Sequence, residues 1–596
     1  MAAVPDPPTQ VGQSIPAHTP HAVSVSLPTW QANVGYEEGD PQVTSKMECG
    51  YPRFFIHPYI QKLVGRIVAK YGQANESGML FPTRKIAEKC RAFLQRYYTE
   101  GNEEERKFRI VELEFGPEGN MPLVHVFVVL FPTDAFRVAK QYWQHCGDIL
   151  SSRQAEYCLR LLDKKAEAEA EQAEALKPKR GNQRYGRPGR PLAANAGGES
   201  CEAEHLSYVE ERYGRNLPVQ YADHAKVALR RRIAGIITEK EDEQALQLED
   251  VKMATEADLE TQRQMQGERN MKGLSEDDVY LYPCGMSAIF HAHQLALAIG
   301  DASRKSVCFG FPYTDTLKIL QKFGAGCHFY GRGEDKDIDD LEALLASGER
   351  ILSLFCELPS NPLLKSPDLR RLRRLADQYD FLLVVDETIG NFYNIGVLEH
   401  ADMVVSSLTK IFSGDSNVMG GSMVLNPNRK HYRELKEALK DDFEDVMWCE
   451  DALFLERNSR SFKARSKIIN ENAEALCDYL VAHQQVKEVY YPKFICRHHY
   501  DAVKTPNGGY GGLFSVTFKS EKAAQAFYDN LHCAKGPSLG TNFTLASPYT
   551  ILAHYTELDW AEEYGVSRFL VRVSVGLEDK QHLLSMFGKA LDAIDA

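Results

Sequence analysis

The feature that most constrains the fold of this chain is the alternation of short apolar runs with amphipathic stretches from Val279 onward. Each run is followed by a loop or by residues whose apolar positions repeat with the period of a helix. The runs are residues 306–310, 351–355, 381–386, 403–407 and 422–425. This pattern predicts an α/β fold in which helices cover both faces of a parallel sheet. In such sheets the ligand lies beyond the carboxyl ends of the strands.

Two charged side chains at the ends of these runs carry the predicted chemistry. Asp386 ends an otherwise apolar run, where a carboxylate needs a partner. Lys410 follows the next run and is preceded by the hydroxyl groups of Ser407 and Thr409. Pyridoxal 5′-phosphate needs a lysine for its aldehyde, a carboxylate for its ring nitrogen and donors for its phosphate. The sequence therefore predicts this cofactor, with Lys410 at its aldehyde carbon and Asp386 at its ring nitrogen.

A glycine at the start of a helix supports the same interpretation. Gly285 opens the apolar helical stretch that ends near residue 299, so backbone N–H groups can approach an anion at the positive end of that helix. Each feature alone has an ordinary alternative, because a glycine can precede any capped helix, Asp386 can form a cap or turn, and Lys410 can lie on the surface. Their combination favours the cofactor.

Composition excludes several functional classes. Acidic residues outnumber basic ones by 83 to 70, whereas nucleic-acid binders usually carry a basic stripe, so we expect no nucleic-acid partner. The most apolar stretch, residues 123–131, is far shorter than the roughly 20 residues that cross a bilayer, so we expect no membrane span. The 13 cysteines include no CxxC pair, and no basic leader precedes Lys46, which favours a reduced, cytoplasmic protein.

A metal site is disfavoured by the spacing of its possible ligands. The candidates are Cys496 with His498 and His499, or His291 with His293. No carboxylate or second cysteine stands at ligand spacing in the sequence near either group. We therefore expect no metal.

Shifts in composition divide the chain into an N-terminal extension (1–162), a linker (163–205), a large cofactor-binding domain with an N-terminal arm (206–470) and a smaller α+β C-terminal domain (471–596). Residues 1–45, rich in Pro, Ser, Thr and Gln, are expected to be extended or loosely ordered. The linker begins with Ala and Glu, which favour a helix, and continues with Arg, Gly and Pro. The acidic stretch 239–278 is expected to be a helical or mobile insertion.

Short motifs resemble the Cys/Met-metabolism family of pyridoxal-phosphate enzymes over residues 206–596. They are residues 284–289 (CGMSAI), 313–316 (YTDT), 357–362 (ELPSNP), 385–388 (VDET), 407–410 (SLTK), 538–540 (SLG) and 570–578 (LVRVSVGLE). The resemblance implies the pyridoxal-phosphate-dependent transferase fold, which is aspartate-aminotransferase-like (fold type I). The N-terminal extension, with residues 21–40 and 50–57, resembles the fungal branch of the family.

The resemblance implies a role for each matching residue. Tyr313 would stack on the cofactor ring and assist proton transfer. Arg572 would bind the substrate α-carboxylate, because its planar guanidinium pairs with both oxygens. The implied cofactor contacts are Lys410, Asp386, Ser407, Thr409, Gly285, Met286, Tyr313, Asn361, Tyr213 and Arg215. The implied substrate contacts are Arg572, Ser538 and Asn361.

The sequence departs from the family pattern at three places. Glu387 replaces the usual asparagine, and residues 415–417 read Asp-Ser-Asn where His-Ser-Asp is common. Residues 312–315, Pro-Tyr-Thr-Asp, lack the double glycine that follows the tyrosine in other members. The geometry of the phosphate loop and the reaction specificity are therefore harder to predict than the cofactor.

Members of the family also use a Tyr-x-Arg motif, on an N-terminal arm, to bind phosphate in the neighbouring subunit. This chain offers two candidates, Tyr213 with Arg215 and Tyr51 with Arg53. We favour the first, because it directly precedes the cofactor-binding module. The acidic stretch between this motif and the module can form a loop, and the entropic cost of closing a loop grows only slowly with its length. The arm implies a homodimer or homotetramer.

The implied reaction joins two amino-acid substrates. The acyl group of O-acetyl- or O-succinyl-L-homoserine would be replaced by the sulfur of L-cysteine, giving L-cystathionine for methionine synthesis. Three alternatives stay open: sulfide as the nucleophile, cleavage of cystathionine by a γ-lyase, and a non-catalytic, cofactor-binding regulatory protein. Lys410, Asp386 and Arg572 are all present, which favours an enzyme.

Overall fold

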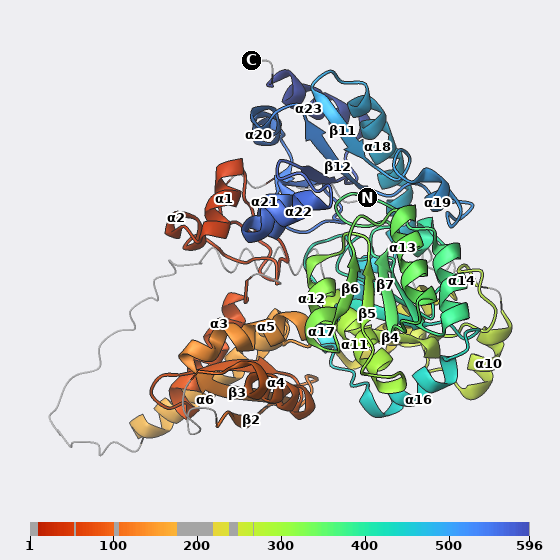
Figure 1. Cartoon of the computed structure of the whole chain (residues 1–596). Helices are drawn as coiled ribbons and strands as arrows, with labels where there is room; N and C mark the ends of the chain where they lie inside the picture. Colours follow the sequence, from red (N-terminus) through yellow and green to blue (C-terminus); the bar gives the residue numbers. More distant parts are fainter. Residues whose placement is uncertain are drawn as a thin grey trace, which may run out of the picture.

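The computed structural model describes residues 7, 10–52, 55–100, 107–175, 219–237, 248–265 and 267–594. These residues form three β-sheets, of three, seven and five strands in chain order (Figure 1). Figure 1 shows the first sheet and its helices beside the central sheet, and the third sheet above it. None of the helices in these ranges has the length and apolarity needed to cross a membrane.

The first sheet belongs to an N-terminal domain with helices on both faces. Its antiparallel strands, in the order β1–β3–β2, are β1 (Glu76–Phe81), β2 (Arg109–Phe115) and β3 (Val124–Pro132). The predicted apolar run forms β3, whose alternate side chains enter two different hydrophobic cores. One core contains α3 (Pro58–Tyr71) and α6 (Ser152–Ala175), and the other contains α4 (Arg84–Tyr97) and α5 (Phe136–Cys146). The predicted linker begins inside α6, and its remainder lies outside the described residues.

The segment before this domain packs against the far end of the chain. The expectation of a loose chain over residues 1–45 is wrong from residue 10 onward, because Val25 and Leu27 are fully buried and α1 (Trp30–Glu38) is a helix. The Trp30 N–H donates to Asp529 at 2.7 Å. A short helix, α2 (Pro41–Thr44), follows. Leu27 packs with Leu552, and the Trp30 ring packs against Tyr528 and Phe569, so the C-terminal domain covers part of this segment.

The central sheet has the strand order β4–β10–β9–β8–β7–β5–β6. Its strands are β4 (Val279–Tyr282), β5 (Ser306–Phe309), β6 (Cys327–Tyr330), β7 (Ser353–Glu357), β8 (Leu382–Asp386), β9 (Met403–Ser407) and β10 (Gly421–Leu425). The expectation of a wholly parallel sheet is wrong at β10, which runs antiparallel to both neighbours. The connection from β9 to β10, residues 408–420, contains no helix, and a parallel crossover usually needs one.

Helices cover both faces of the central sheet. One hydrophobic core includes α8 (Ala222–Ile233), α13 (Asp335–Ala346), α14 (Leu369–Tyr379) and α17 (Cys449–Ser459). The opposite core includes α11 (Gly285–Ile299), α12 (Thr314–Lys322) and α16 (Tyr432–Asp442), and it continues without a break into α4 and α5 of the N-terminal domain. The N-terminal domain is thus packed against the helices that begin at the cofactor motifs.

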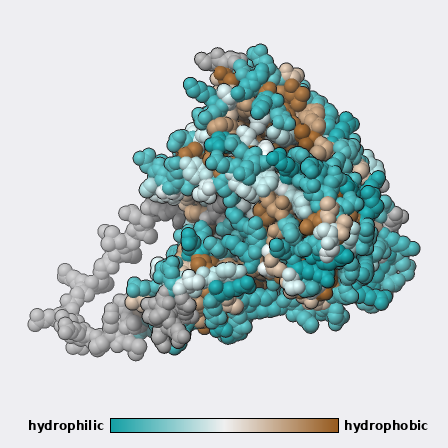
Figure 2. Space-filling view, viewed as in Figure 1, coloured by the Kyte–Doolittle hydropathy of each residue, from teal (hydrophilic) through white to brown (hydrophobic). Residues whose placement is uncertain are grey.

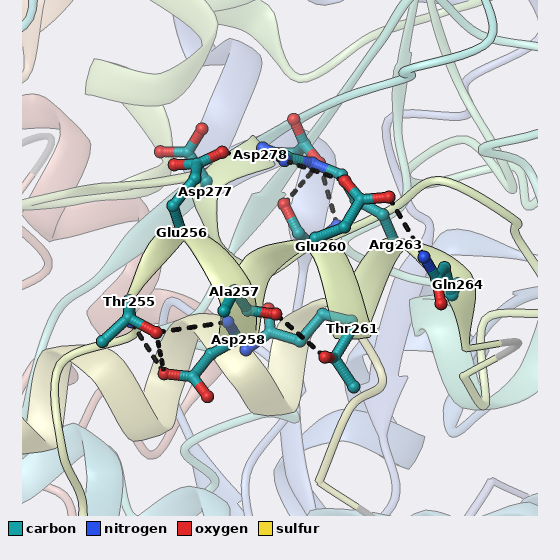
Figure 3. A network of polar contacts seen from close by, with 12 residues as sticks. Thr255, Glu256, Ala257, Asp258, Glu260, Thr261, Arg263, Gln264, Asp277 and Asp278 are labelled. Atoms are coloured by element: carbon teal, nitrogen blue, oxygen red, sulfur yellow. Dashed lines mark hydrogen bonds and ion pairs between the residues drawn. The ribbon is translucent and has the colours of Figure 1, made fainter.

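The acidic stretch before the central sheet is partly helical. Within it, η3 (Leu248–Asp250) and α10 (Glu256–Gln264) are described, and residues 238–247 lie outside the described ranges. Figure 3 shows that Thr255 and Asp258 cap α10 reciprocally. The Thr255 hydroxyl accepts from the Asp258 N–H at 3.3 Å, and the Asp258 carboxylate accepts from the Thr255 N–H at 2.8 Å.

The C-terminal domain is an α+β unit. Its strands, in the order β11–β12–β15–β14–β13, are β11 (Val486–Tyr490), β12 (Leu513–Phe518), β13 (Ala534–Lys535), β14 (Leu545–Ser547) and β15 (Val571–Ser574). Its main helices are α18 (Phe462–Val481), α20 (Glu521–Asn530) and α23 (Lys580–Asp592). In Figure 2 the visible face is mostly hydrophilic, and hydrophobic groups are more frequent toward the top, over this domain.

Candidate functional site

A cavity lies where the three domains meet at the carboxyl ends of β8 and β9. Its volume is about 140 Å³, and it is partly open to solvent. The predicted site residues that line it are Gly285, Met286, Tyr313, Asn361, Asp386, Ser407, Thr409, Lys410, Ser538 and Arg572. Tyr213 and Arg215 lie outside the described residues. The structure thus brings these ten predicted residues into one cavity, although the first and the last, Gly285 and Arg572, are 287 positions apart.

Lys410 lies in the turn after β9 and is buried. Its Nζ donates to Ser538 Oγ at 3.0 Å and to Tyr51 Oη at 3.1 Å. Burial lowers the pKa of Lys410, because it penalises the charged ammonium, and the nearby Arg572 lowers it further. The lowered pKa makes the neutral amine more accessible than in an exposed lysine, and this is the form that can attack an aldehyde or accept a proton.

Asp386 has an acidic neighbour that the sequence interpretation left without a role. Glu357, at the end of β7, pairs in register with Asp386 at the end of β8, and both line the cavity. Burial raises the pKa of Glu357 to about 8, to which the charge of Asp386 contributes, and burial also raises the pKa of Asp386. Among the described residues neither carboxyl forms an ion pair with a Lys, Arg or His side chain. A ring nitrogen that carries a proton would compensate this buried acidity.

Glu357 also organises the residues around it. Its carboxylate accepts from the N–H of Tyr313 and, at 3.0 Å, from the N–H of Asn361. Asp386 accepts from the N–H of Thr388 at 2.8 Å. Glu357 therefore holds the backbone that carries the predicted ring-stacking tyrosine and the predicted asparagine. The signal was present in the sequence, since Glu357 ends an apolar run just as Asp386 does.

The start of α11 lies directly against the end of β9. A Cβ atom at Gly285 would stand 2.6 Å from Ser407 Cβ, so only glycine permits this approach. The Ser407 N–H donates to Thr388 Oγ1 at 2.8 Å. The Thr409 hydroxyl accepts from the Gly420 N–H at 3.1 Å, which ties the lysine turn to β10. Together these contacts form a cradle of small residues at the positive end of a helix, as a phosphate requires.

Arg572 approaches the cavity from β15 of the C-terminal domain and is buried. Its guanidinium donates to Asn361 Oδ1 at 3.0 Å and to the Ser538 carbonyl at 2.7 Å, and lies 4.7 Å from the centre of the Tyr549 ring. Burial lowers the pKa of Arg572. These contacts orient a buried cation without an ion-pair partner among the described residues, which suits it to an anionic substrate group.

Two departures from the family pattern have structural explanations. Glu387 forms a buried ion pair with Arg269 at 2.7 Å and does not line the cavity. Asp415 accepts from Asn542 Nδ2 at 2.6 Å, so it connects the lysine loop to the C-terminal domain. Neither change removes a group from the cavity.

Tyr51 lines the cavity of its own chain, where its hydroxyl meets Lys410. Arg53 lies outside the described residues, as Tyr213 and Arg215 do. The contact supports the candidate that we had ranked second for the Tyr-x-Arg motif. Which of the two motifs binds phosphate stays a prediction.

The histidines that were considered as metal ligands lie outside this cavity. His498 and His499 meet a carboxylate that the sequence spacing did not reveal, because Asp335 Oδ1 lies 3.0 Å from His499 Nε2. This cluster lies near the surface on α13 and α19 (Arg497–Asp501). His291 instead pairs with Asp148 at 2.8 Å.

The residues of the cavity fit pyridoxal 5′-phosphate. Lys410 offers a buried amine of lowered pKa to an aldehyde, and the adjacent carboxyls of Glu357 and Asp386 could keep a ring nitrogen protonated. The positive end of α11, at Gly285, lies at the cavity beside Ser407, where a phosphate could bind. These three features match the three reactive parts of the cofactor.

Comparison with known proteins gives a consistent result. The family described as "Cys/Met metabolism PLP-dependent enzyme" matches residues 261–592, and "Fungal trans-sulfuration enzyme, N-terminal domain" matches residues 59–151. The cystathionine gamma-synthase of Neurospora crassa is 49% identical over 98% of both chains, and that of Saccharomyces cerevisiae is 42% identical over 98% of both. The crystal structure of cystathionine gamma synthase from Xanthomonas oryzae pv. oryzae in complex with cystathionine is 25% identical, with a TM-score of 0.47 over 53% of this chain and 81% of that one.

Proposed function

The chain belongs to the Cys/Met metabolism family of pyridoxal-phosphate-dependent enzymes, and from this premise we propose that it joins O-acyl-L-homoserine to L-cysteine, giving L-cystathionine. The observation that carries the proposal is the convergence of Lys410, Asp386 and Arg572 on one cavity. The two fungal relatives with this name match the chain almost end to end. In the reaction the Cγ–O bond of homoserine breaks, a Cγ–S bond forms, and acetate or succinate leaves with the thiol proton.

Pyridoxal 5′-phosphate, when bound, supplies an electron-withdrawing ring that stabilises negative charge on the substrate α-carbon. Lys410 would hold the cofactor through its aldehyde. Its Nζ is then a base within the cavity, and it takes the proton from the α-carbon of homoserine. Its lowered pKa makes the deprotonated form more accessible for this step, and the nearby Tyr51 and Ser538 hydroxyls keep it oriented. A proton lost from the β-carbon then allows the acyloxy group to leave.

Arg572 orients the substrate for these proton transfers. Its guanidinium binds the α-carboxylate, while Asn361 and the Ser538 carbonyl hold the side chain in place. Both hydrogen bonds use nitrogen atoms of one planar group, so they fix its plane as well as its position. The substrate's α-hydrogen is thereby directed toward Lys410, since Ser538 contacts both residues.

Asp386 and Tyr313 act on the cofactor's ring. Asp386 holds a proton on the ring nitrogen, and the neighbouring Glu357 is then the member of the pair that stays protonated, because two buried carboxylates repel each other. Tyr313 stacks on the ring, positioned through its N–H by Glu357. Ser407, Thr409, Gly285 and Met286 bind the phosphate. The proposal includes assembly into a homodimer or homotetramer and action in the cytoplasm.

A product assay tests the reaction. The purified enzyme, loaded with pyridoxal 5′-phosphate, is incubated with O-acetyl- or O-succinyl-L-homoserine and with either L-cysteine or sulfide, and the products are identified by mass spectrometry. We expect cystathionine from one acyl ester with cysteine, and at least tenfold slower product formation with sulfide. L-cystathionine alone is included as a substrate.

The outcomes separate the alternatives. Homocysteine formed mainly from sulfide would identify a sulfhydrylase instead. Rapid release of cysteine and ammonia from cystathionine would identify a γ-lyase. Bound cofactor without turnover of any of these substrates would favour the regulatory alternative, and the proposed reaction would then be wrong.

A further inference from the structure

The end of the N-terminal domain enters the cofactor site. α5 ends at Cys146, and Gly147 turns the chain with a left-handed conformation (φ 68°). A Cβ atom at Gly147 would stand 2.4 Å from the backbone nitrogen of Ser287, in the first turn of α11. Residues Trp143, Gln144, Gly147 and Ile149 line the cavity itself. We propose that residues 143–149 are a structural part of the cofactor site, which hold the first turns of α11 and α12 and thereby set how tightly the phosphate end of the cofactor is retained.

Asp148 makes the first of two anchors. It is buried, and its carboxylate accepts from the hydroxyl of Ser287 and pairs with His291 Nε2 at 2.8 Å. Both partners belong to α11, and Ser287 lies two residues after Gly285. The Cys284 thiol adds a contact to the Gly147 carbonyl at 3.3 Å. This segment therefore fixes the turn whose N–H groups face the phosphate.

The ion pair also has an electrostatic consequence for the phosphate. An isolated carboxylate at the start of α11 would repel an anion bound there. The charge of Asp148 is balanced by His291, which is held between Asp148 and, at 3.7 Å, Asp442 of α16. The anchor can thus lie beside the phosphate position without lowering the local affinity for anions.

Gln144 makes the second anchor, on the helix that follows Tyr313. Its Nε2 lies 3.1 Å from each carboxylate oxygen of Asp315, a fully buried residue in the first turn of α12. His145 Nε2 lies 3.7 Å from the same carboxylate. Asp315 stands where other members have a glycine after the tyrosine. The aspartate at this position is therefore explained by a contact to the N-terminal domain.

The two anchors predict different effects on the cofactor. α11 contributes to the phosphate end of the site, so the loss of the Asp148 anchor should weaken binding of pyridoxal 5′-phosphate but have little effect on pyridoxal, which has no phosphate. α12 begins at the ring-stacking tyrosine, so the loss of the Gln144 anchor should weaken binding of both compounds. These effects concern binding of the cofactor and do not depend on which sulfur nucleophile the enzyme uses. The binding test and the product assay can therefore fail independently.

The test uses the full chain in its apo form. Asp148→Asn and Gln144→Leu are titrated with pyridoxal 5′-phosphate and with pyridoxal, and hydrogen–deuterium exchange is measured without ligand over residues 284–288 and 313–317. We expect Asp148→Asn to raise the Kd for pyridoxal 5′-phosphate by at least tenfold, which lies within the range of about 5- to 150-fold found for coupled sites. We also expect faster hydrogen–deuterium exchange over residues 284–288. Ser287→Ala, which removes only one hydrogen bond, should give the same pattern at smaller amplitude if Asp148→Asn does not fold.

Two further variants exclude a general loss of stability. Glu112→Gln, on an exposed part of β2, should change neither Kd by more than twofold. Gln144→Leu combined with Asp315→Asn should recover part of the affinity lost in Gln144→Leu, because the buried charge that the amide stabilises is then absent. Unchanged Kd and exchange in folded Asp148→Asn and Gln144→Leu would overturn the inference. Equal weakening of both ligands by Asp148→Asn would overturn the phosphate-specific part.

Discussion

At the scale of single residues, the chemistry depends on the amine of Lys410. Replacing it in Lys410→Ala removes the group that binds the aldehyde and accepts the substrate's proton. We expect the visible absorbance of the lysine-linked cofactor to disappear and turnover to fall by at least a thousandfold, measured with the product assay. Lys440→Ala is the matched control, because that lysine is exposed on α16 and pairs only locally with Glu437. A Lys410→Ala enzyme that retained both properties would refute the role of this lysine.

His291 provides a second prediction at this scale, on pH dependence. Burial would lower its pKa, but the charges of Asp148 and Asp442 outweigh this and raise it from 6.5 to about 9. In the unfolded chain His291 has the ordinary pKa of 6.5. The stability that the folded protein gains from protonated His291 is therefore complete below pH 6.5 and is lost as the pH rises through 9. Each unit of pKa shift corresponds to about 1.4 kcal/mol. The free energy of unfolding of the wild-type protein should therefore fall more between pH 7 and pH 9.5 than that of His291→Gln.

Urea unfolding at both pH values measures this difference. The other groups near His291 are Lys89 of α4, which opposes its protonation, the ring of Tyr282 stacked at 5.1 Å, and Lys85, which pairs with Asp442. If wild-type and His291→Gln lose equal free energy over this pH range, the ion pair is not the cause.

At the scale of elements, the contact between α11 and β9 is the most sensitive to volume. In Gly285→Ala the new methyl group would stand 2.6 Å from Ser407 Cβ and 3.0 Å from Ser407 Cα. The helix and the strand must then separate, which should lower the free energy of unfolding by about 1–3 kcal/mol, as overpacked contacts do. We expect a lower melting temperature of the apo protein and weaker binding of pyridoxal 5′-phosphate. Gly65→Ala, in an exposed position of α3 with open space around it, should instead stabilise the protein by about 0.5–1 kcal/mol.

At the scale of the whole molecule, the N-terminal segment joins the two ends of the chain. Trp30 of α1 is buried, with its ring 6.0 Å from that of Tyr528 and 6.5 Å from that of Phe569. Trp30→Ala should lower the free energy of unfolding by about 3–5 kcal/mol, as measured by urea denaturation. Gln31→Ala, one position along the same helix but exposed, should be close to wild type. Equal stability of the two variants would show that α1 does not dock on the C-terminal domain.

The arrangement of domains also changes the interpretation of the N-terminal extension. Its β-sheet shares a hydrophobic core with α11 and α12, and Tyr51 and residues 143–149 reach the cavity. The sequence assigned no chemistry to this region beyond the possible Tyr-x-Arg motif. The extension is therefore a part of the catalytic unit in space, although it is separate from the cofactor-binding domain along the chain.

Local patterns were sufficient for the α/β architecture and for the residues at strand ends. Continuous apolar runs and helical stretches of period 3.6 are patterns of neighbouring residues, and Asp386, Lys410 and the glycine that opens α11 are recognised from their place beside these patterns. The same local information was not sufficient for the direction of β10 or for the packing of residues 10–45. Both depend on contacts with distant segments, whose free energy appears only when the chain is folded.

The contacts that complete the cavity were decided by tertiary structure alone. Glu357 beside Asp386, Gln144 beside Asp315 and Tyr51 beside Lys410 join residues far apart in the chain. No periodicity relates such partners, because hydrogen bonds and ion pairs depend on separations of a few ångströms in space. The order of residues specifies which groups are available, and the folded chain specifies which of them meet and how burial changes their pKa values.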